Sequence, residues 1–359
     1  MLSKQEIQRY QKHLSLGGFG VEGQSRLKAA KVLIVGMGGL GTPVALYLSA
    51  MGVGTLGLFD FDRVDPTNLH RQIIYHEDDV GQLKVEAARN YLQKQNSLTN
   101  IQIFPRAFTL DDVNILNDFD LVVDGTDQFA MRYLLNDVCR LKGIGYVFGA
   151  IQGMRGMCAL FCPGRGPCYR CLFPEEPPKE MFPTCALDGV LGITPGLVGM
   201  LQATEVIQYC AHLTSPLNAI VHTVCVTPLH FQRYELERDP ECPLCSGRIT
   251  QLDLLHPITE APLEITFHAM RKLQATGAPV QIVDIRTHEE RNAGGVIETS
   301  VHIPLSELKN SSRQLLNPEC TIVCYCRSGC RSLTAVDLLK QAGFEKVFSL
   351  QNGLRDIRT

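Results

Sequence analysis

The chain has 359 residues, 45% of them apolar and 20% charged, which excludes a disordered or collagen-like protein. It carries 34 Lys and Arg against 37 Asp and Glu and no block of about five or six basic residues, so we expect no nucleic-acid partner. No stretch reaches the roughly eighteen consecutive apolar residues of a membrane span, and the N-terminus lacks the features of a secretory signal. We therefore expect a cytoplasmic protein with no membrane partner and two or three domains of about 150 residues.

Strand-like and helix-like segments alternate through the first half of the chain. A helix is expected within the first 30 residues. Short β-rich apolar runs then predict strands at 31–36, 55–60, 101–108 and 120–126, and helical spacing predicts helices at 42–52, 84–95 and 128–141. This alternation is typical of right-handed crossovers, so we expect an α/β fold with a Rossmann-like, mainly parallel sheet.

Composition changes near residue 162. A loop rich in Pro, Gly and Cys precedes a helix-like segment at 197–210 and strand-like runs at 219–226 and 229–236. A second α/β pattern begins near residue 251, with strands expected at 281–286, 321–326 and 346–351 and helices at 266–274 and 331–342. We therefore predict one domain over 1–250, a linker over 251–262 and a smaller α/β domain over 263–359.

The first strand ends in a glycine-rich turn that contains Gly36, Gly38, Gly39 and Gly41. It fits the pattern G-x-G-x-x-G between a strand and a helix, where backbone N–H groups can face phosphate oxygens. Asp60 follows Gly41 by 19 residues, and a carboxylate at that place can accept hydrogen bonds from a ribose. The pattern indicates a nucleotide site and by default means NAD or FAD, while a turn without a ligand is the plain alternative.

Polar residues after the second strand favour a triphosphate over a dinucleotide. They are Asp62, Asn68, Arg71, Gln72 and Lys84. The two cations suit the charge of a triphosphate better than they suit hydride chemistry. Asp127 ends the fourth strand at the same carboxyl edge and could hold Mg²⁺. Any one of these side chains could instead be a solvated loop charge.

Together with DGTD at 124–127 and CYRCLFPEEPP at 168–178, these motifs resemble the MoeB/ThiF family of adenylating enzymes over about residues 3–250. The resemblance implies that Mg²⁺ and ATP serve to adenylate the C-terminal glycine of a small ubiquitin-like sulfur carrier ending in Gly-Gly. It also implies a homodimer. The residues that match the family's ATP or magnesium contacts are Gly38, Gly41, Asp60, Asp62, Asn68, Arg71, Gln72, Lys84 and Asp127.

The sequence departs from this family at two positions. An Arg near the N-terminus, thought to reach the phosphates across a dimer, is Lys12 here, and Lys lacks the bidentate fork of Arg. The Asn that usually follows the DGTD aspartate is Gln128. If either change disables adenylation, the chain would be a non-catalytic module that binds a ubiquitin-like protein.

Two C-x-x-C pairs predict a metal site. Cys168 with Cys171 and Cys242 with Cys245 offer four thiolates, the ligand set of a tetrahedral structural zinc. The alternatives are a redox dithiol or two unrelated loops. The family resemblance agrees with zinc.

Cys185 stands alone in a loop before a helix-forming stretch. A solitary Cys is most often a small buried hydrophobe. The resemblance implies the other role, since this position carries a Cys that can form a covalent bond with the carrier's C-terminus.

A cysteine loop dominates the last hundred residues. Cys326 follows a strand and opens the segment CRSGCRS, so backbone N–H groups, a helix N-terminus and two Arg side chains could stabilise a thiolate or persulfide. A phosphatase loop and an ordinary turn are the alternatives. With DIR at 284–286 and VHIPLSEL at 301–308, the segment resembles a single rhodanese domain over about 260–359, which implies Cys326 as the persulfide position. The usual Gly-His-Ile-Pro is GVIE at 295–298, and Cys330 is an extra thiol in the loop.

The two resemblances together predict an adenylyltransferase fused to a sulfurtransferase, with the catalytic residues Arg71, Lys84, Asp127, Cys185 and Cys326. The product would be a thiocarboxylate on a carrier of molybdopterin or thiamine synthesis, with a cysteine desulfurase or thiosulfate as sulfur donor. An NAD-dependent oxidoreductase is a competing hypothesis that gives Arg71 and Lys84 no use. A stand-alone thiosulfate sulfurtransferase leaves the first 250 residues unexplained.

Overall fold

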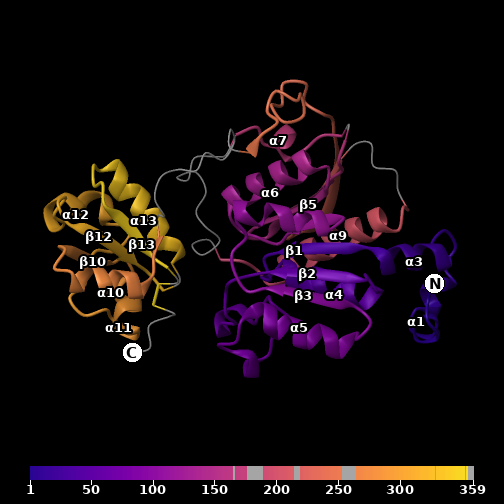
Figure 1. The fold of residues 1–359 in the computed structure, drawn as a ribbon, viewed down its shortest axis with the longest axis horizontal. Helices are drawn as coiled ribbons and strands as arrows, with labels where there is room; N and C mark the ends of the chain where they lie inside the picture. The colour runs from indigo at the N-terminus through magenta and orange to yellow at the C-terminus, as the bar shows by residue number, and fades with distance from the viewer. Residues whose placement is uncertain are drawn as a thin grey trace. The chain divides into compact units, whose positions relative to one another are not determined.

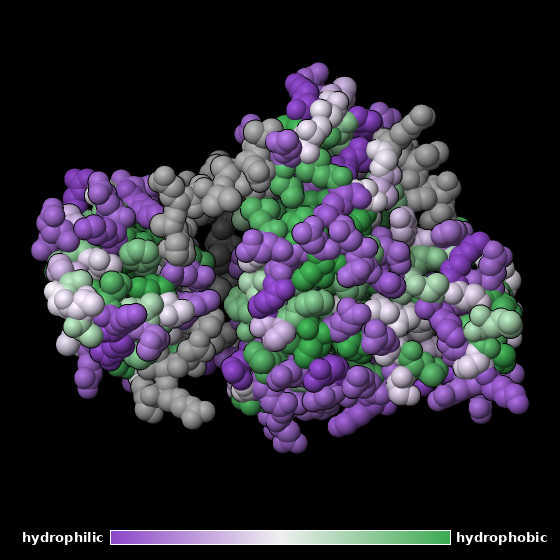
Figure 2. Space-filling view, viewed as in Figure 1, coloured by the Kyte–Doolittle hydropathy of each residue, from purple (hydrophilic) through white to green (hydrophobic). Residues whose placement is uncertain are grey.

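The computed structural model describes residues 1–164, 166–175, 189–213, 219–252, 264–327, 329–351 and 353–354. The chain divides into two compact units, Met1–Pro257 (unit 1) and Ile258–Thr359 (unit 2), each of which is described by itself. Hydrophilic and hydrophobic residues are interspersed over the viewed face of each unit (Figure 2). Within the described ranges, no helix has both the length and the hydrophobicity that a membrane crossing requires.

Unit 1 is built on an eight-stranded sheet in the order β3-β2-β1-β4-β5-β6-β7-β8 (Figure 1). The first five of these strands are parallel, and β6, β7 and β8 add antiparallel neighbours. The strands are β1 Lys31–Val35, β2 Thr55–Phe59, β3 Asn100–Phe104, β4 Leu121–Asp124, β5 Gly145–Gln152, β6 Arg155–Phe161, β7 Ala219–Val226 and β8 Leu229–Leu236. The expected Rossmann-like, mainly parallel sheet is confirmed.

Helices cover both faces of this sheet. They are α1 Lys4–Arg9, α2 Gln11–Leu14, α3 Gly20–Ala29, α4 Gly41–Met51, α5 Lys84–Gln95, α6 Phe129–Lys142, α7 Tyr169–Leu172 and α9 Ile193–Cys210, with 3-10 turns η1 Pro66–Asn68, η2 Glu77–Asp79 and η3 Leu110–Asp118. Alternate residues of β1 point to opposite layers: Val32 and Ile34 pack with α4, α5 and α9, whereas Leu33 and Val35 pack with α6. Burial on both faces explains why the strands are continuous apolar runs.

Three details differ from the sequence prediction. Strand β3 ends at Phe104 instead of continuing to residue 108, because Pro105 has no N–H to extend a ladder. Helix α9 begins at Ile193, four residues early, since Pro195 is tolerated in a first helical turn. The β5–β6 hairpin was not predicted, and it supplies the edge on which β7 and β8 build.

Unit 2 holds a five-stranded parallel sheet in the order β11-β10-β12-β13-β9. Its elements are β9 Glu264–Ile265, α10 Phe267–Ala275, β10 Val280–Asp284, α11 His288–Ala293, β11 Val301–His302, α12 Leu308–Leu315, β12 Thr321–Tyr325, α13 Cys330–Gln341 and β13 Val347–Leu350. One core layer joins the sheet to α12 and α13, and the opposite layer joins it to α10. The predicted smaller α/β unit is confirmed as a fold.

Candidate functional site

The glycine turn joins β1 to α4 at the point where the strand order reverses, since β1 pairs with both β2 and β4. Gly36 has a φ of 92°, and a Cβ there would lie 2.8 Å from the Gly125 carbonyl. A Cβ on Gly41 would lie 1.9 Å from the Gly36 oxygen. Side chains are therefore excluded at both ends of the turn, and the turn lies at the crevice where α/β sheets bind ligands.

Asp60 braces this turn from the end of β2. Its carboxylate accepts hydrogen bonds from the N–H of Met37 and the N–H of Asp62, each at 2.7 Å. Burial raises the pKa of Asp60, the Lys84 ammonium opposes the rise, and Asp62 adds to it. The sequence prediction placed Asp60 beside a ribose, and that role stays a prediction. In the structure the Asp60 carboxylate accepts from the backbone of the glycine turn and so fixes its shape.

Lys84 and Asp62 form an ion pair at the same edge. The Lys84 ammonium lies 2.8 Å from the Asp62 carboxylate, and its side chain is 5% exposed. Lys84 is the first residue of α5, and its N–H donates to the Asp62 carbonyl at 2.9 Å. Both residues are thereby held near the end of β2, with the ammonium buried in the protein.

Arg71 and Gln72 reach the glycine turn from the segment after η1. Arg71 donates to Asn68 Oδ1 at 2.9 Å and to the Thr67 carbonyl at 3.1 Å. A Cβ on Gly39 would lie 3.6 Å from Arg71 Cδ, and a Cβ on Gly38 would lie 3.7 Å from Gln72 Nε2. In the structure, Arg71 and Gln72 therefore lie beside the glycine turn, although they are distant from it in the sequence.

One buried atom in this region lacks a partner. Gln72 is 3% exposed, and its Oε1 accepts no hydrogen bond from the residues that the structure describes. A buried acceptor of this kind normally has a donor. Beside a glycine turn and two cations, an orphaned amide oxygen fits a polyphosphate nucleotide, whose hydroxyl and amino groups can donate.

Two predicted ATP-site residues lie outside this cluster of contacts. Asp127 is exposed just beyond β4, at the carboxyl edge where the other residues gather. Lys12 is exposed on α2, and the side-chain contacts described above do not include it. Gln128 is the N-cap residue of α6.

The sequence analysis missed Asp124, the last residue of β4. This side chain is fully buried and accepts from the Thr126 N–H at 2.9 Å, the Thr126 hydroxyl at 2.7 Å and the Tyr146 hydroxyl at 2.7 Å. Burial raises its pKa. Asp124 therefore holds the segment that carries Asp127, and its signal in the sequence was a carboxylate inside the apolar run LVVD.

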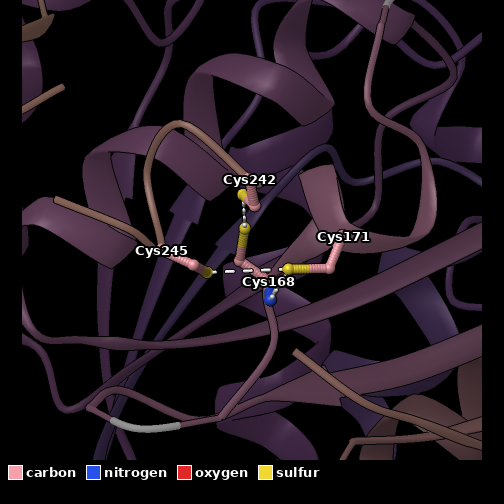
Figure 3. Close-up of side chains that lie close together, drawn as sticks. All are labelled: Cys168, Cys171, Cys242 and Cys245. Carbon is pink, nitrogen blue, oxygen red and sulfur yellow. Dashed lines mark hydrogen bonds between the residues drawn. The ribbon is translucent and has the colours of Figure 1, made fainter. Parts of the chain in front are cut away.

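The four cysteines of the two C-x-x-C pairs converge (Figure 3). Their sulfurs all lie within 4.8 Å of one another, with Cys168 and Cys242 3.7 Å apart and Cys171 and Cys245 3.6 Å apart. A tetrahedron with Zn–S bonds of about 2.3 Å has edges of about 3.8 Å, and a disulfide would need about 2.05 Å. The donor set and its geometry fit zinc and do not fit a dithiol that closes to a disulfide.

The loop after β12 curls around one sulfur. Cys326 is fully buried and accepts a hydrogen bond from the Gly329 N–H at 3.2 Å. The Ser332 hydroxyl lies 3.7 Å from the sulfur and bonds to the Ser349 hydroxyl at 2.8 Å. A backbone N–H of the loop thus faces the Cys326 sulfur, as the sequence predicted. Cys324, two residues earlier, differs: burial raises the pKa of its thiol to about 12, so that thiol is a core residue.

Two predicted thiols stay predictions. Cys185 lies outside the described residues. Helix α13 begins at Cys330, which fixes that residue's place in the chain and leaves its role open.

Unit 1 combines a glycine turn on a parallel sheet with a cluster of four cysteines, and unit 2 holds a loop that closes on one cysteine. This combination agrees with an adenylating domain joined to a rhodanese domain. Comparison with known families agrees: the ThiF family matches residues 10–244, and the rhodanese-like domain matches residues 266–359. The chain belongs to the ThiF family and carries a C-terminal rhodanese-like domain.

Three relatives illustrate the match. A Mycobacterium tuberculosis protein named "Probable adenylyltransferase/sulfurtransferase MoeZ" is 36% identical over 366 residues, which span 98% of this chain and 93% of the relative. The "Sulfur carrier protein adenylyltransferase" of Thermus thermophilus is 42% identical over 70% of this chain and 96% of its own length. The crystal structure of E. coli MccB with AMPCPP and MccA has a TM-score of 0.57 and 26% identity, covering 67% of this chain and 74% of that one.

Proposed function

We propose that this chain adenylates the C-terminal glycine of a small ubiquitin-like sulfur carrier and then transfers sulfur to it from a persulfide on Cys326. The main support is that one chain contains two such features. One is a glycine turn with the cations Arg71 and Lys84 at the same edge of the sheet, and the other is a loop that folds around the buried Cys326. The relative that spans 98% of the chain is named for both activities. Neither an oxidoreductase nor a stand-alone sulfurtransferase accounts for this combination.

In the first half-reaction a carboxylate oxygen of the carrier attacks the α-phosphorus of ATP. A C–O–P bond forms, the bond to pyrophosphate breaks, and an acyl-adenylate remains. Lys84 and Arg71 offset the negative charge that develops on the phosphate oxygens, a preorganised electrostatic effect. Asp127, with Asp62 beside Lys84, would hold Mg²⁺, which supplies further positive charge when bound.

In the second half-reaction the outer sulfur of the Cys326 persulfide attacks the acyl carbon, and AMP leaves. The resulting acyl disulfide is opened by a second thiol, which attacks the Cys326 sulfur and releases the thiocarboxylate. Cys185 is our candidate for that thiol, and an external thiol reductant then frees the disulfide that forms. Fusion of the two domains raises the effective concentration of persulfide near the adenylate.

We infer a structural role for zinc at Cys168, Cys171, Cys242 and Cys245. The four ligands come from α7 and from the loop after β8, so one metal ion would join segments about 70 residues apart in sequence. Metal analysis of the purified chain should find one zinc per chain, and a Cys245→Ser variant should lose it. Absence of metal in a folded chain would contradict this inference.

The remaining proposals concern partners and location. We propose a homodimer, which the resemblance to the ThiF family implies, and a cytoplasmic enzyme, which the sequence features favour. We also propose a cysteine desulfurase as the source of the persulfide. The carrier is a small protein ending in Gly-Gly that serves molybdopterin or thiamine synthesis.

The deciding experiment is carrier-dependent exchange of labelled pyrophosphate into ATP. Small ubiquitin-like proteins ending in Gly-Gly are supplied one at a time, with Asp127→Ala as the control. Exchange with one carrier, lost in the control, would establish adenylation and name the pathway. ATP binding without exchange for any carrier would favour the non-catalytic binding module, and Lys12→Arg would then be the first reversion to make.

A further inference from the structure

A cation of the helix that follows the cysteine cradle is already paired with a carboxylate. Arg331, in the first turn of α13, donates two hydrogen bonds to the Glu290 carboxylate, at 2.8 and 2.6 Å. Glu290 lies on α11, and this pairing with Arg331 lowers the pKa of its carboxyl group. The two side chains are 24% and 36% exposed, so the pair stands at the surface of unit 2.

Arg331 also belongs to the surroundings of the reactive sulfur. It lies one residue before Ser332, whose hydroxyl is 3.7 Å from Cys326 Sγ. The pairing with Glu290 raises the pKa of Arg331, and the Cys326 sulfur adds to this rise. Arg331 is therefore paired with a carboxylate from another helix of unit 2 and is the chain neighbour of a residue that lies against the reactive sulfur.

A second guanidinium of unit 2, which is buried, is also paired with a carboxylate. Arg286 donates to both oxygens of the Asp284 carboxylate, at 2.9 and 2.7 Å, and both residues are buried. Arg327, in the cysteine loop itself, is exposed. Arginine side chains of this kind can bind anions, but Arg331 and Arg286 are each already paired with a carboxylate of the protein.

We infer that Glu290 is a specificity-determining residue of unit 2: by neutralising Arg331 it disfavours dianionic sulfur donors, of which thiosulfate is the simplest, relative to a low-charge cysteine persulfide. This inference rests on the proposed sulfur transfer at Cys326. Its physical basis is Coulombic, because one unit of charge near the donor changes the energy of a dianion twice as much as that of a monoanion.

Both donors deliver the same atom. The Cys326 thiolate attacks the outer sulfur of the donor, a new S–S bond forms, and the donor's S–S bond breaks. Thiosulfate leaves as sulfite and carries two negative charges away, whereas a cysteine persulfide leaves as a thiolate. The two donors therefore differ in the charge that they bring to the surroundings of Cys326, where Arg331 and Glu290 are paired.

The test compares two variants on adjacent residues of α11. Glu290→Gln removes the charge and keeps the capping box with Thr287, since Gln serves at that position as well as Glu. Glu289→Gln removes an equal charge from an exposed neighbour and is the matched control. Loading of Cys326 is followed with thiosulfate and, separately, with free cysteine persulfide, whose carboxylate, ammonium and persulfide groups leave a net charge of about −1, as the low-charge probe.

We expect Glu290→Gln to raise kcat/KM about tenfold for thiosulfate and about threefold for the persulfide, with changes below about twofold in Glu289→Gln. The difference should shrink in roughly 1 M KCl, where the screening length falls to about 3 Å. Equal changes for the two donors, or none, would overturn the inference. Failure of the unaltered chain to load sulfur from either donor would instead contradict the proposed function.

A second measurement uses the unaltered chain, in case the variant does not fold. Iodoacetamide alkylation of Cys326 is followed by mass spectrometry with and without sulfate, a dianion that cannot donate sulfur. We expect sulfate in the millimolar range to leave the rate unchanged in the unaltered chain and to slow it in Glu290→Gln. Protection of the unaltered chain by sulfate would overturn the inference.

Discussion

Both units place a tight turn between a parallel strand and a helix, and the two turns are built in different ways. In unit 1 the turn from Gly36 to Gly41 has no side chain at its two ends, and Arg71 and Gln72 approach it from outside. In unit 2 the turn after β12 closes on its own Cys326 sulfur through the Gly329 N–H. Under the function proposed above, the first turn would receive a phosphate that arrives with the substrate, and the second would hold a sulfur that belongs to the chain.

The pKa values of the buried carboxylates also shift in different directions in the two units. In unit 1, burial raises the pKa of Asp124 and of Asp60. In unit 2, burial also acts to raise the pKa of Asp284, but hydrogen bonds from Arg286 outweigh it and lower the pKa. The effect of burial on the pKa therefore dominates at Asp60 and Asp124 in unit 1, whereas the effect of pairing with Arg286 dominates at Asp284 in unit 2.

The largest expected effect tests whether the two turns act separately. Cys326→Ala should reduce sulfur transfer by about a thousandfold or more, because it removes the nucleophile itself. Pyrophosphate exchange should remain within about twofold of the unaltered chain, since the exchange needs only unit 1. Cys320→Ser, a buried thiol on the same unit, is the control and should retain both activities.

Loss of both activities in Cys326→Ala, in a chain that still melts cooperatively, would contradict this division. The two turns would then have to be parts of one site.

The next effect concerns the cation of unit 1. Lys84→Met should lower the rate of carrier-dependent pyrophosphate exchange about a hundredfold, the scale for removing one preorganised charge from a transition state. Lys94→Met, at the exposed end of the same helix, should change it less than twofold. Sulfur loading of Cys326 should be unaffected by either change. A fall in loading with Lys84→Met would contradict the separate action of the two units.

The sequence predicted the features that depend on local pattern. The glycine turn, each of the two C-x-x-C pairs and the Cys326 loop occupy a few neighbouring residues with a distinctive spacing, and the structure brings the two C-x-x-C pairs together. Apolar runs bounded by glycines likewise predicted β1, β2 and β4 within a residue or two.

What the sequence could not supply are partnerships that only packing creates. Glu290 and Arg331 are 41 residues apart, and nothing local indicates that α11 meets the first turn of α13. The link from Asp124 to Tyr146 likewise depends on the pairing of β4 with β5. The apolar run at 145–161 carried no turn signal strong enough to be divided into two strands, although Gly153 has the positive φ of a turn residue.

A third prediction compares the carboxylates directly. Asp284→Asn should cost about 3 kcal/mol of local stability, because it leaves the buried Arg286 guanidinium without its counter-charge. Asp124→Asn should cost about 1 kcal/mol or less, since its amide oxygen can still accept from Thr126 and its charge was disfavoured by burial. Hydrogen exchange of amides in β10 and β12, and separately in β4 and β5, measures each unit's change on its own.

The two carboxylates should also differ in their pH dependence. The lowered pKa of Asp284 means that its stabilising contribution is complete above its unfolded value of 3.8 and is lost as the pH falls through the folded value. The raised pKa of Asp124 has the opposite sign, so stability falls as the pH rises from 3.8 through its folded value. Equal acid sensitivity of the exchange rates in Asp284→Asn and the unaltered chain would contradict the assignment in unit 2.

The smallest expected effect concerns the backbone strain at one residue of each unit. Thr299 in unit 2 has a φ of 69°, and His212 in unit 1 has a φ of 55°. A β-branched residue in the left-handed region costs about 1–2 kcal/mol, part of which is returned because glycine loses more entropy on folding. Thr299→Gly should therefore stabilise unit 2 by about 0.5–1 kcal/mol. His212→Gly should change the stability of unit 1 less, because His is tolerated at positive φ more readily than Thr.

Chemical denaturation followed by hydrogen exchange would show the difference. A destabilised Thr299→Gly would mean that the exposed hydrogen bond from the Thr299 hydroxyl to the Glu298 carbonyl outweighs the strain, which at a solvent-exposed site would be an unusually large contribution.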